Sequence, residues 1–175
     1  YGESGDDVLI AGAGGDRLDG GVGNDILDGG ANGSVSFEWD EWMEKDVNYD
    51  VAEYDASIDR FELNKFTFVG KNMAIKDQND NTVFTITAET KGGDTIGKIT
   101  RAGSDKVVYQ IDEGETFYSV SDSLPESYGG YGTDILLGME TARFGYEWDG
   151  NVEFQVDYRI DSWTDWNTGQ VNGQV

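Results

Sequence analysis

The 175-residue sequence contains no cysteine, no histidine and a single proline. Without cysteine and histidine, zinc sites, thiol catalysis, Ser-His-Asp triads and imidazole metal ligands are excluded. The sequence also lacks the G-x-S-x-G nucleophile motif and the phosphate-binding lysine loop. Carboxylates are abundant enough for a glycosidase pair, but they are better explained as cation ligands and solvated strand faces. We therefore expect a protein that is not an enzyme.

Positive charge is scarce as well. The chain carries 12 lysines and arginines against 35 acidic residues, which gives a formal net charge of −23. Nucleic acids and acidic lipid surfaces need a basic patch, so neither is expected as a partner. No apolar run reaches membrane length, and we expect no membrane insertion. Multivalent cations are the natural partners of such a chain, and without them its self-repulsion should leave it poorly folded.

A nine-residue period dominates the start of the chain. Units 2–10, 11–19 and 20–28 follow one another, and the third matches the pattern G-G-x-G-x-D-x-U-x at every fixed position. A fourth unit begins at Gly29 but has Ser34 where the aspartate belongs. In each unit, glycines permit a tight turn, and a short strand follows whose leucine (Leu9, Leu18 or Leu27) points inward. The period predicts a parallel β-roll.

The turns of this roll offer oxygen ligands only, which is the hard ligand set that Ca²⁺ prefers. The sixth residue of each complete unit, Asp7, Asp16 or Asp25, supplies a carboxylate. The predicted backbone ligands are the carbonyls of Gly2, Ser4, Ala11, Ala13, Gly20, Val22, Gly29 and Ala31. Because two units make one coil, Asp7 should face Asp25. Asp16 should face the loop 29–34, which has no carboxylate, so that site should be weaker or finished by another residue.

These repeats resemble the RTX, or haemolysin-type calcium-binding, family of bacterial secreted proteins. The resemblance implies Ca²⁺ as the cofactor, with Asp7, Asp16 and Asp25 as ligands. It also implies export by a type I secretion channel and a location outside the cell or at its surface. Because the sequence opens mid-pattern at Tyr1, we interpret it as a fragment of a larger secreted protein or adhesin, with flanking domains of that parent as neighbours.

After residue 34 the nine-residue period gives way to the alternation typical of β-strands. Such runs lie at 35–39, 51–54, 61–69, 73–75, 83–87, 96–100, 106–111, 117–120, 141–144 and 152–160, and 38–46 is weakly helical. Polar turns separate the runs at the spacing of an antiparallel β-sandwich. The predicted fold is all-β: a calcium-binding β-roll over 1–34, truncated at its N-terminal side, followed by a β-sandwich-like capping domain over 35–175.

Two later segments also suggest metal sites. Residues 129–137 fit the nonapeptide pattern again and make Asp134 a candidate ligand; the alternative is a packed strand that binds no metal. With residues 138–144, this stretch resembles the segment that often follows RTX arrays. Residues 77–81 mimic the first ligands of an EF-hand loop, but Thr82 and Ala88 stand where its glycine and glutamate belong. A polar turn is the better interpretation there.

Two tryptophan pairs, Trp39 with Trp42 and Trp163 with Trp166, lie near acidic residues. They would suit a carbohydrate-binding face, although burial in a core is the more common use of tryptophan. The main hypothesis is a non-catalytic calcium-binding domain of a type I secreted exoprotein, which folds on calcium binding outside the cell. One alternative is a calcium-rigidified module of a large adhesin that binds an extracellular glycan or peptide. Another is the non-catalytic tail of a secreted hydrolase or polysaccharide-modifying enzyme.

Overall fold

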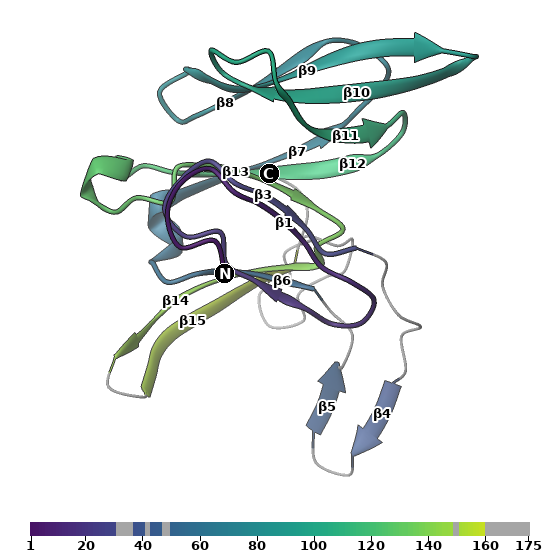
Figure 1. Ribbon diagram of the computed structural model, residues 1–175. Helices are drawn as coiled ribbons and strands as arrows, with labels where there is room; N and C mark the ends of the chain where they lie inside the picture. Colours follow the sequence, from purple (N-terminus) through teal and green to yellow (C-terminus); the bar gives the residue numbers. More distant parts are fainter. Residues whose placement is uncertain (31–36, 41–42, 47–49, 149–150, 160–175) are drawn as a thin grey trace.

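The computed structural model describes residues 1–30, 37–40, 43–46, 50–148 and 151–159 (Figure 1). This part of the chain consists of β-strands, turns and two single-turn 3-10 helices, which confirms the predicted all-β class. The elements are β1 (Val8–Ile10), β2 (Arg17–Leu18), β3 (Ile26–Asp28), β4 (Phe37–Asp40), β5 (Met43–Asp46), β6 (Val51–Tyr54), η1 (Ile58–Arg60), β7 (Phe61–Thr67), β8 (Met73–Lys76), β9 (Thr82–Lys91), β10 (Asp94–Arg101), β11 (Val107–Asp112), β12 (Thr116–Asp122), η2 (Glu126–Tyr128), β13 (Thr133–Leu137), β14 (Thr141–Trp148) and β15 (Asn151–Arg159). Among these residues, no helix has the length and apolar character needed to cross a membrane.

The chain alternates between two sheets, as the nine-residue period requires. Strands β1, β3 and β13 pair in parallel in a five-stranded sheet, while β2, β6 and β14 pair in parallel in a four-stranded sheet. In the first ladder Val8 lies opposite Ile26, and Ile26 lies opposite Ile135. The first step is one of 18 residues, which confirms that two nonapeptide units make one coil.

Long insertions separate the later strands of these ladders. The hairpin of β4 and β5 precedes β6, so the weak helix expected over 38–46 is wrong. Strands β7 to β12 come between β6 and β13, and β13 nevertheless pairs directly with β3. Antiparallel partners then extend the two sheets: β12 and β7 beyond β13, and β15 beyond β14. An antiparallel sandwich beginning at residue 35 is therefore not confirmed.

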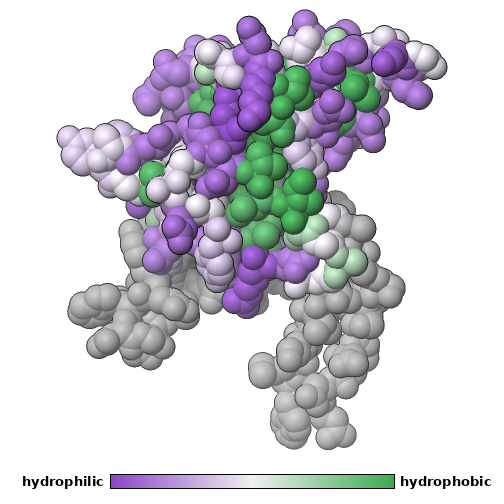
Figure 2. Space-filling model, viewed as in Figure 1, coloured by the Kyte–Doolittle hydropathy of each residue, from purple (hydrophilic) through white to green (hydrophobic). Residues whose placement is uncertain are grey.

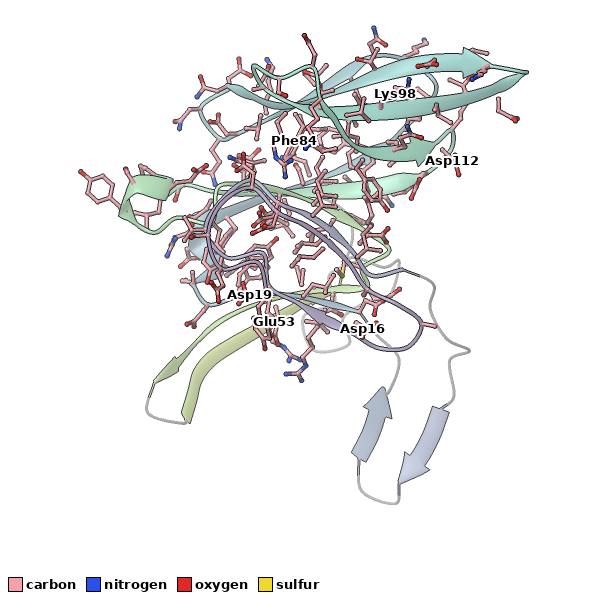
Figure 3. The ribbon with its side chains drawn as sticks, in the orientation of Figure 1. Asp16, Asp19, Glu53, Phe84, Lys98 and Asp112 are labelled. Carbon is pink, nitrogen blue, oxygen red and sulfur yellow. The ribbon has the colours of Figure 1, made fainter. Side chains whose placement is uncertain are left out.

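Two hydrophobic cores lie on opposite faces of the five-stranded sheet. Consecutive residues of a strand point to opposite faces, so Leu27 and Leu136 enter one core and Ile26 and Ile135 enter the other. The first core fills the interior between the two parallel ladders, and Leu9 and Leu18 pack against its edge, as the repeat pattern predicts. The second core faces a further sheet of order β11-β10-β9-β8, which contributes Phe84 (Figure 3).

The first strand of the roll is exposed. β1 is the edge strand of its sheet, and Ile10 is 64% exposed. Figure 2 shows hydrophobic surface over β1, on a face that is otherwise largely hydrophilic. The described interior is thus best packed around β3 and β13.

Replacement of a core leucine tests this packing. Leu27→Ala removes a fully buried side chain from the interior of the ladders, and we expect the free energy of unfolding in calcium to fall by about 2–5 kcal/mol. Val69→Ala is the control, since Val69 is 60% exposed, and it should cost no more than about 0.5 kcal/mol. Denaturant unfolding measures both variants. Equal losses would contradict the proposed packing.

Candidate metal centre

Six acidic residues stand where the six parallel strands begin. Asp7, Asp25 and Asp134 form a first column on one side of the coil, at the starts of β1, β3 and β13. Asp16, Asp50 and Glu140 form a second column on the other side, at the starts of β2, β6 and β14. The strands pair in register, so their starting residues stack one above another. Figure 3 labels Asp16 in its turn.

A repeated hydrogen bond joins successive members of each column. In the first column, the backbone N–H of Asp7 donates to Asp25 Oδ1 (2.8 Å), and that of Asp25 donates to Asp134 Oδ1 (2.8 Å). In the second, Asp16 N–H donates to Asp50 Oδ1 (2.7 Å), and Asp50 N–H donates to Glu140 Oε2 (2.8 Å). The prediction that Asp7 faces Asp25 is confirmed, and each receiving acid has one oxygen satisfied by the preceding coil.

The second carboxylate oxygen has no such partner in four of these acids. The Oδ2 atoms of Asp7, Asp16, Asp25 and Asp50 are buried and accept no hydrogen bond from the described residues. Asp25 and Asp50 are themselves 0% exposed. A buried carboxylate oxygen without a donor is costly unless a cation or a proton compensates it. The two columns are therefore built to receive positive charge.

Glycines let a carbonyl oxygen approach each of two such carboxylates. A Cβ on Gly2 would lie 2.7 Å from Asp7 Oδ2 and closer still to the carbonyl oxygen of Gly20, one coil further on. A Cβ on Gly29 would likewise lie 2.6 Å from Asp50 Oδ2, with the carbonyl oxygen of Gly138 against it. In both places a carboxylate oxygen and a carbonyl oxygen from the next coil lie beside a glycine, where a larger side chain would not fit. Such oxygen sets suit Ca²⁺.

Burial raises the pKa values of two of these carboxyl groups. Desolvation raises the pKa of Asp25 to about 7; the hydrogen bond from Asp7 opposes this rise, and the charge of Asp7 adds to it. Desolvation likewise raises the pKa of Asp50 to about 6, with Glu140 as the largest repelling charge. In the described part of the chain no three acidic side chains converge into a metal site. A cation here depends on backbone carbonyls as well as carboxylates.

Asp50 fills the place that the fourth unit leaves open. The sequence predicted that Asp16 would face a loop without a carboxylate, and that the site would be weaker or finished by another residue. The acid that faces Asp16 is Asp50, which accepts the N–H of Asp16 from beyond the insertion. Residues 50–53 do fit the last four positions of a nonapeptide, but the insertion breaks the period. Glu140 was also missed, because the pattern calls for aspartate.

Asp134 differs from the other aspartates of the columns. It is fully buried, its Oδ1 accepts the N–H of Asp25, and its Oδ2 accepts the hydroxyl of Tyr54 at 2.9 Å. Burial, followed by the charge of Asp25, raises the pKa of Asp134 well above its usual range. Both of its oxygens thus have protein donors, and its role as a metal ligand stays a prediction.

The remaining predicted residues divide by position. The stacked turns contain Gly2, Ser4, Ala11, Ala13, Gly20, Val22 and Gly29. Within them the carbonyl of Val22 accepts the N–H of Gly5 (2.8 Å). Ala31, Trp42, Trp163, Trp166 and the side chain of Trp39 lie outside the described residues. The EF-hand-like segment is a polar turn, as expected, in which Asp77 Oδ1 accepts the N–H groups of Asn79 and Asn81 (2.8 Å each).

Comparison with known proteins agrees with the geometry of the turns. Residues 1–33 match the family model of the RTX calcium-binding nonapeptide repeat, described as four copies. RTX nonapeptide repeats bind Ca²⁺, so the predicted repeat family and the predicted cofactor of this segment are confirmed. The match ends before Asp50, Asp134 and Glu140. No curated protein and no solved structure matches the chain.

The raised pKa values predict an unusual pH dependence when calcium is removed by a chelator. A carboxyl whose folded pKa exceeds its unfolded value, about 4, stabilises the fold fully below that value, and the contribution is lost as pH rises through the folded pKa. The pKa is about 6 for Asp50 and about 7 for Asp25. The denaturant concentration at the unfolding midpoint, measured in chelator, should therefore decrease as the pH is raised from 4 to 7.

Calcium affinity should rise over the same interval, because protons compete for the same carboxylates. Denaturant titrations at several pH values, with and without calcium, measure both trends. Asp25→Asn should flatten the upper part of the curve in chelator. A midpoint that increases with pH in chelator would contradict the assignment.

Proposed function

We propose that this chain is a non-catalytic calcium-binding module of a type I secreted exoprotein, which folds when calcium becomes available outside the cell. The observation that carries the proposal is the set of four buried Oδ2 atoms that lack hydrogen-bond donors among the described residues. Three of them, in Asp7, Asp16 and Asp25, lie in turns that match a calcium-binding repeat, and the fourth, in Asp50, lies beyond the match. Acids arranged in this way repel one another until a cation is bound.

We also propose that the calcium-dependent roll extends past residue 34. The parallel pairing of β6 with β2, and of β13 with β3, supports this extension. The two columns draw their acids from positions 7 to 140, so the segments must come together before the columns are complete. Cation binding would then organise most of the described chain, and β12, β7 and β15 would cover the outer edges of the ladders.

Arg101 supports such coupling between the repeat and the distant sheet. It ends β10, and its Nη2 donates to the carbonyls of Asp7 (3.1 Å) and Asn24 (3.3 Å) in successive coils. Its Nε also lies 3.5 Å from Asp6 Oδ2. Separation of the two turns would break these contacts, so the arrangement of the turns is coupled to the position of this sheet.

The extracellular part of the proposal rests on calcium concentration. Calcium sites of extracellular modules typically bind with dissociation constants of about 10⁻⁴ to 10⁻³ M. Cytoplasmic free calcium is far lower, so an acidic chain of this kind would stay unfolded there and fold after export. A module of a large adhesin, or the tail of a secreted hydrolase, would fold on calcium binding in the same way.

Calcium titration followed by circular dichroism tests the proposal. We expect a weakly structured spectrum in chelator and a strand-rich spectrum in millimolar calcium. Magnesium at the same concentration is the control and should give little change, because it demands a tighter octahedral shell and dehydrates reluctantly. Identical spectra in chelator and calcium would overturn the proposal.

A second candidate function, ligand binding, is favoured by a cavity of about 400 Å³. It lies between the turn that contains Asn79, the loop before η2 and the outer side of the first column. Its lining is rich in amide, carboxylate and guanidinium groups, including Asp6, Asn81, Arg101 and Glu126. Groups of these kinds hydrogen-bond to hydroxyls, so a saccharide would suit the cavity.

A glycan array probed with the calcium-loaded chain tests the second function. Binding should weaken at least several-fold in Asn79→Ala, because Asn79 lines the cavity and the substitution removes its amide while keeping the backbone N–H that holds the turn. Lys91→Ala, in a residue exposed at the end of β9, serves as the control. An array without any bound glycan would exclude the second function for the saccharides tested.

A further inference from the structure

We infer a calcium site at the lower end of the second column, between Asp50 and Glu140. Both residues lie beyond the matched repeat segment, which ends at residue 33. The site would therefore be built by the insertion boundary and by the segment after β13, rather than by the nonapeptide array alone. This inference rests on the proposed calcium-dependent function and adds a specific place and specific residues to it.

Asp50 supplies the first observation. Its side chain is 0% exposed, and its Oδ1 is already used by the N–H of Asp16 at 2.7 Å. Its Oδ2 is buried and accepts no hydrogen bond from the described residues. A Cβ on Gly29 would lie 2.6 Å from this oxygen and 2.5 Å from the carbonyl oxygen of Gly138, so both oxygens lie beside the same glycine. A fully buried carboxylate oxygen without a donor is costly unless a cation compensates it.

Glu140 supplies the second observation, because its carboxylate is fixed beside Asp50 from the next coil. Its Oε2 accepts the N–H of Asp50 at 2.8 Å. In return, the carbonyl of Asp50 accepts the N–H groups of Glu140 and Thr141, each at 3.2 Å. Three hydrogen bonds thus join the turn of Asp50 to the turn of Glu140. They hold the two carboxylates close together despite the repulsion between their charges.

More oxygen atoms surround the same place. A Cβ on Gly138, whose φ is +59°, would lie 3.1 Å from the carbonyl oxygen of Gly30 and 3.4 Å from Asp28 Oδ1. Asp28 is held by the N–H of Gly30 (2.8 Å) and by the hydroxyl of Tyr109. We therefore assign Asp28 a supporting negative charge. Carboxylate and carbonyl oxygens at this density are the ligand type that Ca²⁺ takes in six- to eightfold coordination.

The first column ends differently, which provides an internal comparison. At its last step Asp134 Oδ2 accepts the hydroxyl of Tyr54, so a protein donor satisfies this oxygen. The first-column counterpart of Asp50 is Asp25, and the Oδ2 atoms of both accept no hydrogen bond from the described residues. Asp50 therefore needs a compensating cation as much as Asp25 does, although it lies beyond the matched repeats.

Calcium stoichiometry of the full chain tests the inference. Equilibrium dialysis followed by metal analysis, at pH 7.5, would compare the unaltered chain with Asp50→Asn, Glu140→Gln and Asp112→Asn. We expect Asp50→Asn and Glu140→Gln each to lose about one calcium ion per chain. Asp112 is exposed at the end of β11 (Figure 3), and its replacement should leave the number unchanged. An unchanged number in Glu140→Gln, with the fold confirmed by circular dichroism, would overturn the inference.

A second measurement does not depend on any variant. Crystals of the unaltered chain grown with calcium should show an anomalous scattering peak about 2.3–2.6 Å from Asp50 Oδ2. Peaks beside Asp7 and Asp25 with none beside Asp50 would overturn this inference while leaving the proposed function standing. A chain that binds no calcium in dialysis would overturn both. The two failures are therefore distinguishable even if Asp50→Asn does not fold.

Discussion

A half-satisfied carboxylate is the feature on which the described structure depends. In each column an acid accepts a backbone N–H from the preceding coil through one oxygen, and this bond sets the separation and register of the turns. The same bond holds the carboxylates of Asp25 and Asp50 in the interior, where their second oxygens find no described donor. The bond that aligns the coils therefore also places these two acids where a cation is needed. A substitution that removes the carboxylate charge would therefore also change the hydrogen bonds that stack the turns.

The hydrophobic cores depend on that alignment. Ile26 and Leu27 follow directly after Asp25 and enter opposite cores, so any displacement of Asp25 would move both. The core on the outer face continues into the sheet of β8 to β11, to which Arg101 is also tied. On the other ladder, Glu53 lies 3.3 Å from Arg17 and 3.6 Å from Arg143, and so joins three successive parallel strands at the surface. These partly exposed pairs contribute little energy, but they show that the register extends over the three parallel strands of this ladder.

The sequence alone predicted the local features of this arrangement and missed the distant ones. The nine-residue period was sufficient to predict that Asp7 faces Asp25, because a fixed period implies a fixed register between coils. It could not identify Asp50, since an insertion separates that residue from the glycines of its own turn, nor Glu140, since the pattern requires aspartate there. The alternation over 51–54 and 141–144 correctly predicted strands. Alternation does not reveal whether a neighbour runs parallel or antiparallel, and the expected sandwich went beyond what those residues could indicate.

Magnitudes explain why a cation should decide between the folded and unfolded states. Leaving a buried polar group without a partner costs about 1–3 kcal/mol, and more when the group is charged. Four such oxygens in the described columns together amount to a cost comparable with the whole stability of a typical domain, about 5–15 kcal/mol. Protonation can remove part of this cost, but at neutral pH it competes with ionisation even for Asp25, whose pKa is raised to about 7. A bound cation removes the cost without a proton, and its contribution grows with its concentration. The acidic columns thus make the stability of the fold depend on the calcium concentration of the solution. Buried apolar residues at the same positions would make the stability independent of calcium.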